Sequence, residues 1–246
     1  MAEIRSIVNQ VLSQLGTSRE ARYYLKQYSE DDLQFAVIKI GGAVLEEQIK
    51  PLASALAFLA NLGLMPIILH GAGPQLDQAL KDANVSTEKR KGLRVTTPEV
   101  MEVARPVIYR ANRRLVRALE DEGVRAAGIQ HGVFVCDYLD RDALGLVGEI
   151  ERIDLEAVRE AVERGVLPVV ACLGESPTGQ VMNINADIAA RELIWKVKPH
   201  KIIFLTGTGG LLDENGRIIS AISLRTDYDW LIDQDWVHSG MQLKLE

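Results

Sequence analysis

Cysteine, an excess of positive charge and long apolar runs are all missing or scarce in this chain of 246 residues. The two cysteines, Cys136 and Cys172, each lie in an apolar stretch, so we expect buried thiols rather than a disulfide. A formal net charge of −6 argues against non-specific binding to nucleic acid or to an anionic membrane. No apolar run approaches the roughly 20 residues of a membrane span, and the first residues lack the order of a signal peptide. We therefore expect a cytoplasmic protein with no nucleic-acid or membrane partner.

Common signatures of nucleotide enzymes are also absent. The sequence has no Walker A loop and no protein-kinase catalytic loop, so any nucleotide chemistry must use another scaffold. No internal repeat or low-complexity linker interrupts the chain. What it does have is 47% hydrophobic residues, enough for the core of one α/β domain or two small ones.

One stretch suggests where a site lies. Residues 35–40 are apolar apart from Lys39, and Gly41 and Gly42 stop the run, which predicts a buried strand leading into a tight loop. A lysine near a strand end needs water or an anion to offset its desolvation. Glycine N–H groups can approach a phosphate closely. Taken alone, the pattern fits a solvated turn as well as a phosphate site.

A second glycine-rich loop strengthens the phosphate interpretation. After a helix predicted at 51–62 and a strand at 66–69, the sequence HGAGP at 70–74 leads into a helix predicted from 75 to 83. The N–H groups and dipole at a helix N-terminus favour phosphate. Loops at the carboxyl ends of neighbouring parallel strands are the usual ligand site of an open α/β sheet. We expect His70 to be a hydrogen-bonding loop residue rather than a metal ligand.

The remaining segments complete an alternating α/β pattern. Residues 4–15 have helical spacing ahead of the first core strand, so this helix either packs on a neighbouring chain or on its own domain. Further elements are predicted as helices at 99–122, 155–164 and 188–196, strands at 166–173 and 201–205, a hairpin or small sheet from 128–135 and 145–150, and a hairpin around 213–219.

Two polar segments are candidates for holding an acidic ligand. Arg94 stands out in the basic segment 88–97, where its guanidinium either clamps a carboxylate or is simply solvated. In NINAD at 183–187, Asp187 either caps the following helix or orients a nearby cation. A third glycine-rich strand end, TGTGG, follows at 206–210, and Lys244 comes soon after Gly240.

Together these motifs resemble a known family. The order KIGG at 39–42, HGAGP at 70–74, GLRVT at 92–96, NINAD at 183–187 and GMQLK at 240–244 is similar to that of the N-acetylglutamate kinases of the amino acid kinase family. The forms HGAGPQ and LTGTGGLLD and the N-terminal helical segment are more similar to the kinase domains of bifunctional N-acetylglutamate synthase/kinases. The resemblance covers nearly all of the chain from residue 35 onward.

The resemblance implies a three-layer αβα sandwich with a mainly parallel central sheet, and phosphoryl transfer from ATP, with Mg²⁺, to the side-chain carboxylate of N-acetyl-L-glutamate. It implies three groups of site residues and no metal-ligating side chain. The catalytic residues would be Lys39, Lys244 and Asp187; the ATP-binding residues Gly41, Gly42, Gly71, Ala72, Gly73, Thr206, Gly207 and Gly210; and the substrate-binding residues Gly71, Ala72, Arg94, Asn183 and Asn185.

Three departures from the family pattern leave alternatives open. Ala72 replaces the usual middle glycine, Gly207 stands where an aspartate is common, and the chain stops at Glu246, where relatives continue. We expect two parts: an N-terminal helical segment at 1–34 that acts as an oligomerisation arm, and a kinase domain at 35–246 that is truncated at its C-terminus.

The alternatives are a non-catalytic arginine-sensing or oligomerisation domain, or a kinase for glutamate, aspartate or carbamate. Retention of two lysines favours catalysis. A homodimer or homotetramer and arginine as an allosteric ligand are further expectations.

Overall fold

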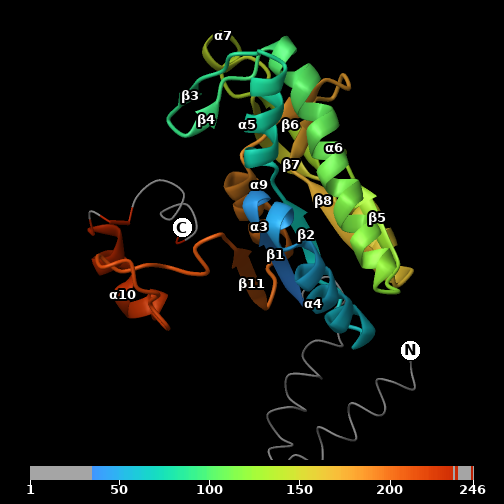
Figure 1. The fold of residues 1–246 in the computed structure, drawn as a ribbon, viewed down its shortest axis with the longest axis vertical. Coiled ribbons are helices and arrows are strands. Elements are labelled where there is room, and N and C mark those ends of the chain that lie inside the picture. The colour runs from blue at the N-terminus through green and yellow to red at the C-terminus, as the bar shows by residue number, and fades with distance from the viewer. Residues whose placement is uncertain (1–34, 235, 238–244, 246) are drawn as a thin grey trace, which may run out of the picture.

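The computed structural model describes residues 35–234, 236–237 and 245 (Figure 1). Its main sheet has five parallel strands in the order β11, β1, β2, β8 and β5. The strands span Lys201–Leu205, Ala36–Ile40, Ile67–His70, Leu167–Ala171 and Ala126–Ile129 respectively. Every residue of β1, β2 and β8 is buried, as expected for strands covered on both faces.

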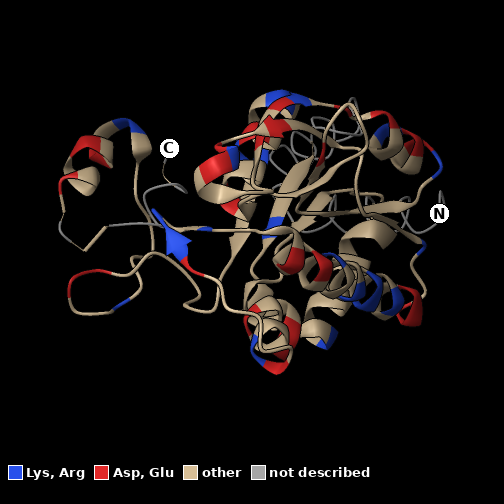
Figure 2. Cartoon of the chain, turned by 90° about the horizontal axis from the view of Figure 1, so that it is seen from above, with Lys and Arg blue, Asp and Glu red and all other residues tan. Residues whose placement is uncertain are grey.

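Helices cover both faces of this sheet, which confirms the predicted three-layer α/β architecture (Figure 2). One layer contains α3 (Gly42–Glu47), α4 (Ile49–Asn61), α5 (Gly73–Asp82) and α6 (Pro98–Asp121). The other contains α8 (Glu156–Glu163), which packs on β8 and β5, and α9 (Ala186–Val197), which packs on β1 and β2. The longest helix, α6, begins where Thr97 accepts a hydrogen bond from the Val100 N–H.

A second sheet lies beside the first and has the strand order β10, β9, β6 and β7. These strands span Val181–Asn183, Leu173–Glu175, Phe134–Tyr138 and Gly148–Ile153. β6 and β7 form the expected antiparallel pair, with the short helix α7 (Arg141–Leu144) between them in the chain. A small hairpin of β3 (Lys89–Arg90) and β4 (Leu93–Arg94) precedes α6.

Two predicted strands are each divided between the sheets. The segment predicted at 128–135 contains the end of β5 and the start of β6, separated by a turn in which Gly132 has a φ of 91°. The segment predicted at 166–173 contains β8 of the main sheet and the first residue of β9. The prediction of single strands was wrong here because continuous apolar character cannot show where a buried chain changes sheet.

Smaller differences lie at element ends. Gly42 begins a helix directly, where a tight loop was expected. The hairpin predicted at 213–219 is reduced to one antiparallel bridge between Leu212 and Ile218. Beyond it, α10 (Leu224–Ile232) lies to one side of the main sheet (Figure 1). The helix predicted at 4–15 falls outside the described residues.

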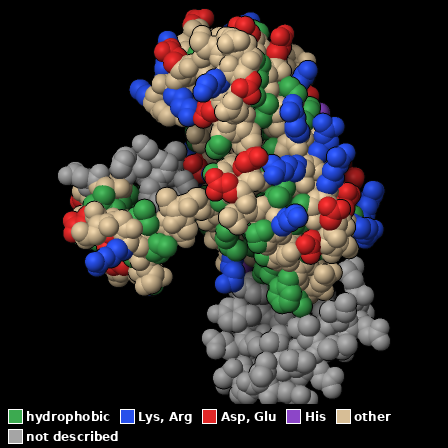
Figure 3. Space-filling view, viewed as in Figure 1, with side chains coloured by type: hydrophobic (Ala, Val, Ile, Leu, Met, Phe, Trp, Pro, Cys, Tyr) green, Lys and Arg blue, Asp and Glu red, His purple; other side chains and the backbone are tan. Residues whose placement is uncertain are grey.

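The surface is basic along α6 despite the net negative charge of the chain. Figure 3 shows Lys and Arg side chains gathered over this side of the molecule. The exposed arginines of α6 are Arg105, Arg110, Arg113, Arg114 and Arg117. Among the described residues, no helix is long and apolar enough to cross a membrane.

Candidate active site

Four neighbouring strands of the main sheet, β11, β1, β2 and β8, end at the same edge. The register pairs Ile40 at the end of β1 with Leu205 of β11 and with His70 of β2. The three glycine-rich segments predicted from the sequence therefore follow adjacent strands. This carboxyl edge is where open parallel sheets bind ligands.

The glycine N–H groups differ in their availability. Those of Gly41 and Gly71 donate to carbonyl oxygens of neighbouring strands, at 2.9 and 3.1 Å. The N–H groups of Gly42 and Ala43 in α3 and of Gly73 in α5 have no acceptor within the part of the chain that is described. The donors open to a phosphate thus include these first helical residues, at the positive ends of two helix dipoles.

The first two loops come closest at Gly42. A methyl group placed on Gly42 would lie 2.8 Å from Gln75 Oε1, 2.8 Å from Pro74 Cδ and 3.0 Å from the Gly73 nitrogen. Gly71 in turn lies near the start of α9, because a methyl group on it would be 3.2 Å from the Cβ of Ala186. The close approach of α3 to α5 therefore depends on the absence of a side chain at Gly42, and that of the loop after β2 to α9 on its absence at Gly71.

Lys39 forms the central ion pair of the site. Its Nζ lies 2.8 Å from Asp187 Oδ1, and the two side chains are only 9% and 17% exposed. Asp187 is not the cap of α9, because Asn185 Oδ1 accepts the N–H groups of Asp187 and Ile188, at 2.8 and 3.2 Å. Of the two roles left open for Asp187, the structure supports the one beside a cation. Lys244, the second predicted cation, lies outside the described residues.

A cavity of about 140 Å³ lies between the loop after β2, β4 and the start of α9, and neither Lys39 nor Asp187 lines it. It brings together the predicted residues Gly71, Ala72, Gly73, Arg94 and Asn183. Asn185 is not among the lining residues; its side-chain oxygen Oδ1 caps α9. The complete lining is His70, Gly71, Ala72, Gly73, Leu76, Arg94, Ile108, Cys172, Asn183, Ile184 and Ala186.

Arg94 supplies the positive charge of the cavity. Its side chain is 9% exposed, and its Nη2 pairs with Asp77 of α5, which is half exposed. The other N–H groups of the Arg94 guanidinium have no partner among the residues described. A planar guanidinium with free N–H groups can bind a carboxylate in a bidentate manner. This geometry suits an acidic ligand in the cavity.

The sequence did not reveal a buried pair between His70 and Asn112. His70 is fully buried, with Nε2 3.1 Å from Asn112 Nδ2 of α6 and Nδ1 3.4 Å from the Gly71 carbonyl oxygen. The same Asn112 nitrogen donates to the Val169 carbonyl oxygen at 2.9 Å. Because the amide nitrogen donates, the His70 ring is neutral, with its proton on Nδ1. Burial lowers the pKa of His70 to about 4.

Thr206, Gly207 and Gly210, predicted to contact ATP, follow β11 at the same edge. Thr206 Oγ1 lies 3.0 Å from Thr208 Oγ1, which donates to the Gly210 carbonyl oxygen at 3.2 Å. A methyl group on Gly207 would meet no heavy atom within 4 Å. A side chain would therefore fit at Gly207, and the role of this segment in binding ATP stays a prediction.

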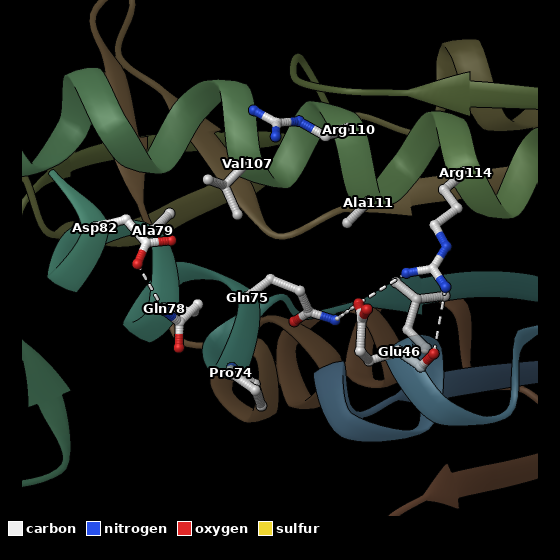
Figure 4. A pocket seen from close by; sticks show the side chains of 11 residues that line it. Glu46, Pro74, Gln75, Gln78, Ala79, Asp82, Val107, Arg110, Ala111 and Arg114 are labelled. Carbon is white, nitrogen blue, oxygen red and sulfur yellow. Dashed lines mark hydrogen bonds and ion pairs between the residues drawn. The ribbon is translucent and has the colours of Figure 1, made fainter.

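Behind the first two glycine-rich loops lies a second cavity of about 450 Å³, between α3, α5 and α6 (Figure 4). Gln75 Nε2 donates to the Gly42 carbonyl oxygen at 2.7 Å and to Glu46 at 3.2 Å, and Arg114 pairs with Glu46 at 2.8 Å. The hydrogen bonds from Arg114 and then from Gln75 hold the pKa of Glu46 below its usual value. A polar chain thus connects the surface of α6 to the loop after β1.

An open parallel sheet with a cation and helix N-termini at one edge is the class of fold that binds phosphate groups. The chain belongs to the amino acid kinase family, whose sequence profile matches residues 34–246.

Individual relatives agree with this assignment. An acetylglutamate kinase from Xylella fastidiosa (strain 9a5c) is 49% identical over 233 residues, which cover 94% of this chain and 55% of that protein. The protein ARG5,6, mitochondrial, of Candida albicans is 44% identical over 98% of this chain and 28% of its own length. A solved structure from Streptococcus mutans UA159 superposes with a TM-score of 0.77 at 29% identity, covering 86% of this chain and 87% of that one. The chain thus spans about half the length of the Xylella relative.

Proposed function

We propose that this chain transfers the γ-phosphoryl group of ATP to the side-chain carboxylate of N-acetyl-L-glutamate, giving N-acetyl-L-glutamyl 5-phosphate in arginine biosynthesis. The observation that carries the proposal is the buried Lys39–Asp187 pair at the sheet edge that also holds the glycine-rich loops and the cavity containing Arg94 and Asn183. The acetylglutamate kinase from Xylella, at 49% identity, supports the choice of acceptor.

The residue types fit the chemistry of this reaction. A carboxylate is already ionised at pH 7, so it can attack phosphorus without a catalytic base. The protein must bring two anions together and stabilise the charge on the transferred group. In this proposal Arg94 and Asn183 hold the α-carboxylate of the substrate, Lys39 and Lys244 flank the phosphoryl group, and Asp187 orients the lysines.

ATP enters this scheme as its magnesium complex, in which Mg²⁺ neutralises part of the phosphate charge. Within the described residues no group of three His, Cys, Asp or Glu side chains could hold a metal ion. We propose that ATP oxygens and water carry most of the coordination of Mg²⁺.

The test is ATP-dependent acyl-phosphate formation, trapped as the hydroxamate, with N-acetylglutamate, glutamate, aspartate, carbamate or no acceptor. Product with N-acetylglutamate alone is the expected result. Lys39→Ala should lower turnover by about 100-fold or more, corresponding to about 3 kcal/mol of transition-state stabilisation, with a smaller effect on KM.

Other outcomes distinguish the alternatives. Product with another acceptor would replace the substrate assignment. Absence of product with every acceptor, together with calorimetric binding of arginine, would favour the non-catalytic arginine-sensing domain. A dimer or tetramer formed through residues 1–34, which lie outside the described part, and a cytoplasmic location also stay predictions. Light scattering at micromolar concentration tests the oligomer.

A further inference from the structure

Thr96 is fully buried and joins three segments around the cavity. It lies two residues after the end of β4 and directly precedes Thr97, the cap of α6. Its backbone N–H donates to the Leu144 carbonyl oxygen at 2.9 Å, and its own carbonyl oxygen accepts the Leu146 N–H at 2.6 Å. These backbone bonds attach the segment after α7 to the end of β4, and they do not depend on the Thr96 side chain.

The Thr96 hydroxyl makes a second set of contacts. Oγ1 donates to the Arg94 carbonyl oxygen at 2.9 Å and accepts from Asn183 Nδ2 at 3.1 Å. A carbonyl oxygen can only accept, so the single hydroxyl proton faces Arg94 and a lone pair faces Asn183. The Asn183 amide must therefore turn its nitrogen toward Thr96. Its Oδ1 and second N–H have no partner among the described residues.

Arg94 and Asn183 both line the 140 Å³ cavity, although they come from distant parts of the sequence. Thr96 and Asn183 are 87 positions apart; the Thr96 hydroxyl bonds to the Asn183 side chain, while the Asn183 backbone N–H donates to the Leu146 carbonyl oxygen at 2.9 Å. Asp77 meanwhile holds the Arg94 guanidinium from the α5 side. The Arg94 carbonyl oxygen and the Asn183 side-chain amide thus both hydrogen-bond to the same buried atom, Thr96 Oγ1.

We propose that Thr96 is a positioning residue whose hydroxyl orients the Asn183 side-chain amide and ties it to the backbone of Arg94 for binding the substrate carboxylate. This inference rests on the proposed function for the identity of the ligand. Without the hydroxyl, the Arg94 carbonyl oxygen loses a donor and the Asn183 amide can rotate. The consequence falls on substrate binding, because Lys39, Asp187 and the glycine-rich loops are not among the groups that Thr96 contacts.

The test compares Thr96→Val, which replaces the hydroxyl with a methyl group of similar size, with Thr96→Ser, which keeps the hydroxyl. We expect Thr96→Val to raise KM for N-acetylglutamate by about tenfold, the effect of one lost hydrogen bond that leaves a buried group unpaired. kcat and KM for ATP should stay within about twofold. Thr96→Ser should keep the wild-type KM for N-acetylglutamate.

Thr97→Val is the matched control. Thr97 is adjacent, but its hydroxyl accepts from the Val100 N–H and caps α6. Its loss should lower the melting temperature without changing KM. An unchanged KM in Thr96→Val, or equal KM increases in Thr96→Val, Thr96→Ser and Thr97→Val, would overturn the proposal.

A second measurement does not depend on catalysis. The side-chain amide signal of Asn183, assigned by its loss in Asn183→Ala, should exchange slowly with solvent in the wild type and Thr96→Ser, and faster in Thr96→Val. If the wild type shows no turnover with any acceptor, the proposed function fails, while amide exchange still decides whether the link exists. An unchanged Asn183 signal in Thr96→Val would disprove the link.

Discussion

At the scale of single residues, Gly42 and Gly73 form a matched pair in the glycine-rich loops. A methyl group on Gly42 would meet three atoms of the second loop at 2.8–3.0 Å, whereas one on Gly73 meets nothing within 4 Å. We expect Gly42→Ala to lower the free energy of unfolding by about 1–3 kcal/mol through overpacking. Gly73→Ala should be neutral or stabilising by up to about 1 kcal/mol. Urea unfolding of both variants checks this, and equal effects would contradict the crowding at Gly42.

His70 makes stability depend on pH. Burial lowers the pKa of its ring from 6.5 to about 4, so the folded protein resists a proton that the unfolded chain binds. The contribution of His70 to stability is complete above pH 6.5 and is lost as the pH falls toward 4, by about 3 kcal/mol in total. Urea unfolding between pH 7.5 and 4.5 should show a smaller decrease in His70→Gln than in the wild type.

Carboxylates also titrate in this range, so the difference between the two proteins is the informative quantity. If the free energy of unfolding falls equally steeply with pH in both proteins, His70 is accessible to protons in the folded state. A steeper fall in the wild type below pH 6.5 would support the neutral His70 ring that the Asn112 amide requires.

At the scale of elements, Gln75 couples α5 to α3 by donating to the Gly42 carbonyl oxygen. It also donates to Glu46 (Figure 4). Gln75→Leu keeps the size of the side chain and removes these bonds. We expect it to lower stability by about 1 kcal/mol and turnover by about tenfold, because the loop after β1 loses its anchor. Gln78→Leu is the control: Gln78 is on the same helix, its side chain bonds to no described residue except Asp82, and its loss should leave turnover unchanged.

Arg114 contributes less to stability than Gln75, because both side chains of its ion pair with Glu46 are about half exposed. Arg114→Ala should change stability by less than about 1 kcal/mol. Urea unfolding and hydroxamate assays on Gln75→Leu, Gln78→Leu and Arg114→Ala separate the contribution of Gln75 from that of Arg114. Equal turnover in the Gln75→Leu and Gln78→Leu variants would contradict the anchoring role.

Elements with strong local signals could be predicted from the sequence. The strand at 201–205 and the long helix starting near Pro98 lie where they were predicted, because each has an apolar pattern with clear ends. The expectation that this strand is buried was wrong, because β11 is an edge strand and Lys201 and Ile202 are exposed. The division of 166–173 between two sheets could not be predicted, since both parts are equally buried. The role of Asp187 could not be decided from the sequence, because Asn185 and Asp187 are both good cap residues. The structure shows that Asn185 caps α9 and that Asp187 pairs with Lys39.

The candidate site was predictable only where its residues carry local motifs. Lys39, Arg94 and Asn183 were found because they stand in recognisable segments. The hydroxyl of Thr96 and the amide of Asn112 were missed as positioning groups, because their partners lie 87 and 42 positions away. Such long-range pairs leave no periodicity in a single sequence.

At the scale of the whole molecule, the site depends on the joint between the two sheets. β8 of the main sheet leads through Cys172 into β9, and β10 ends at Asn183 on the far side of the cavity. A ligand held by Asn183 and by the loop after β2 would therefore contact both sheets. Binding should suppress any motion that separates them.

Cys172 reports on that motion, because it lines the cavity and is 4% exposed. Burial raises its thiol pKa to about 12, so labelling by a thiol reagent at pH 8 requires the structure to open.

In a Cys136→Ala variant, where Cys172 is the one thiol left, N-acetylglutamate at 100 times its Kd should slow labelling by about 100-fold. The rate of reagent release, followed by absorbance with and without N-acetylglutamate, measures this. The complementary Cys172→Ala variant keeps Cys136, which is buried in β6, does not line the cavity and should be protected less. Equal protection of both thiols would mean that labelling follows global unfolding, and no protection of Cys172 would place the substrate elsewhere.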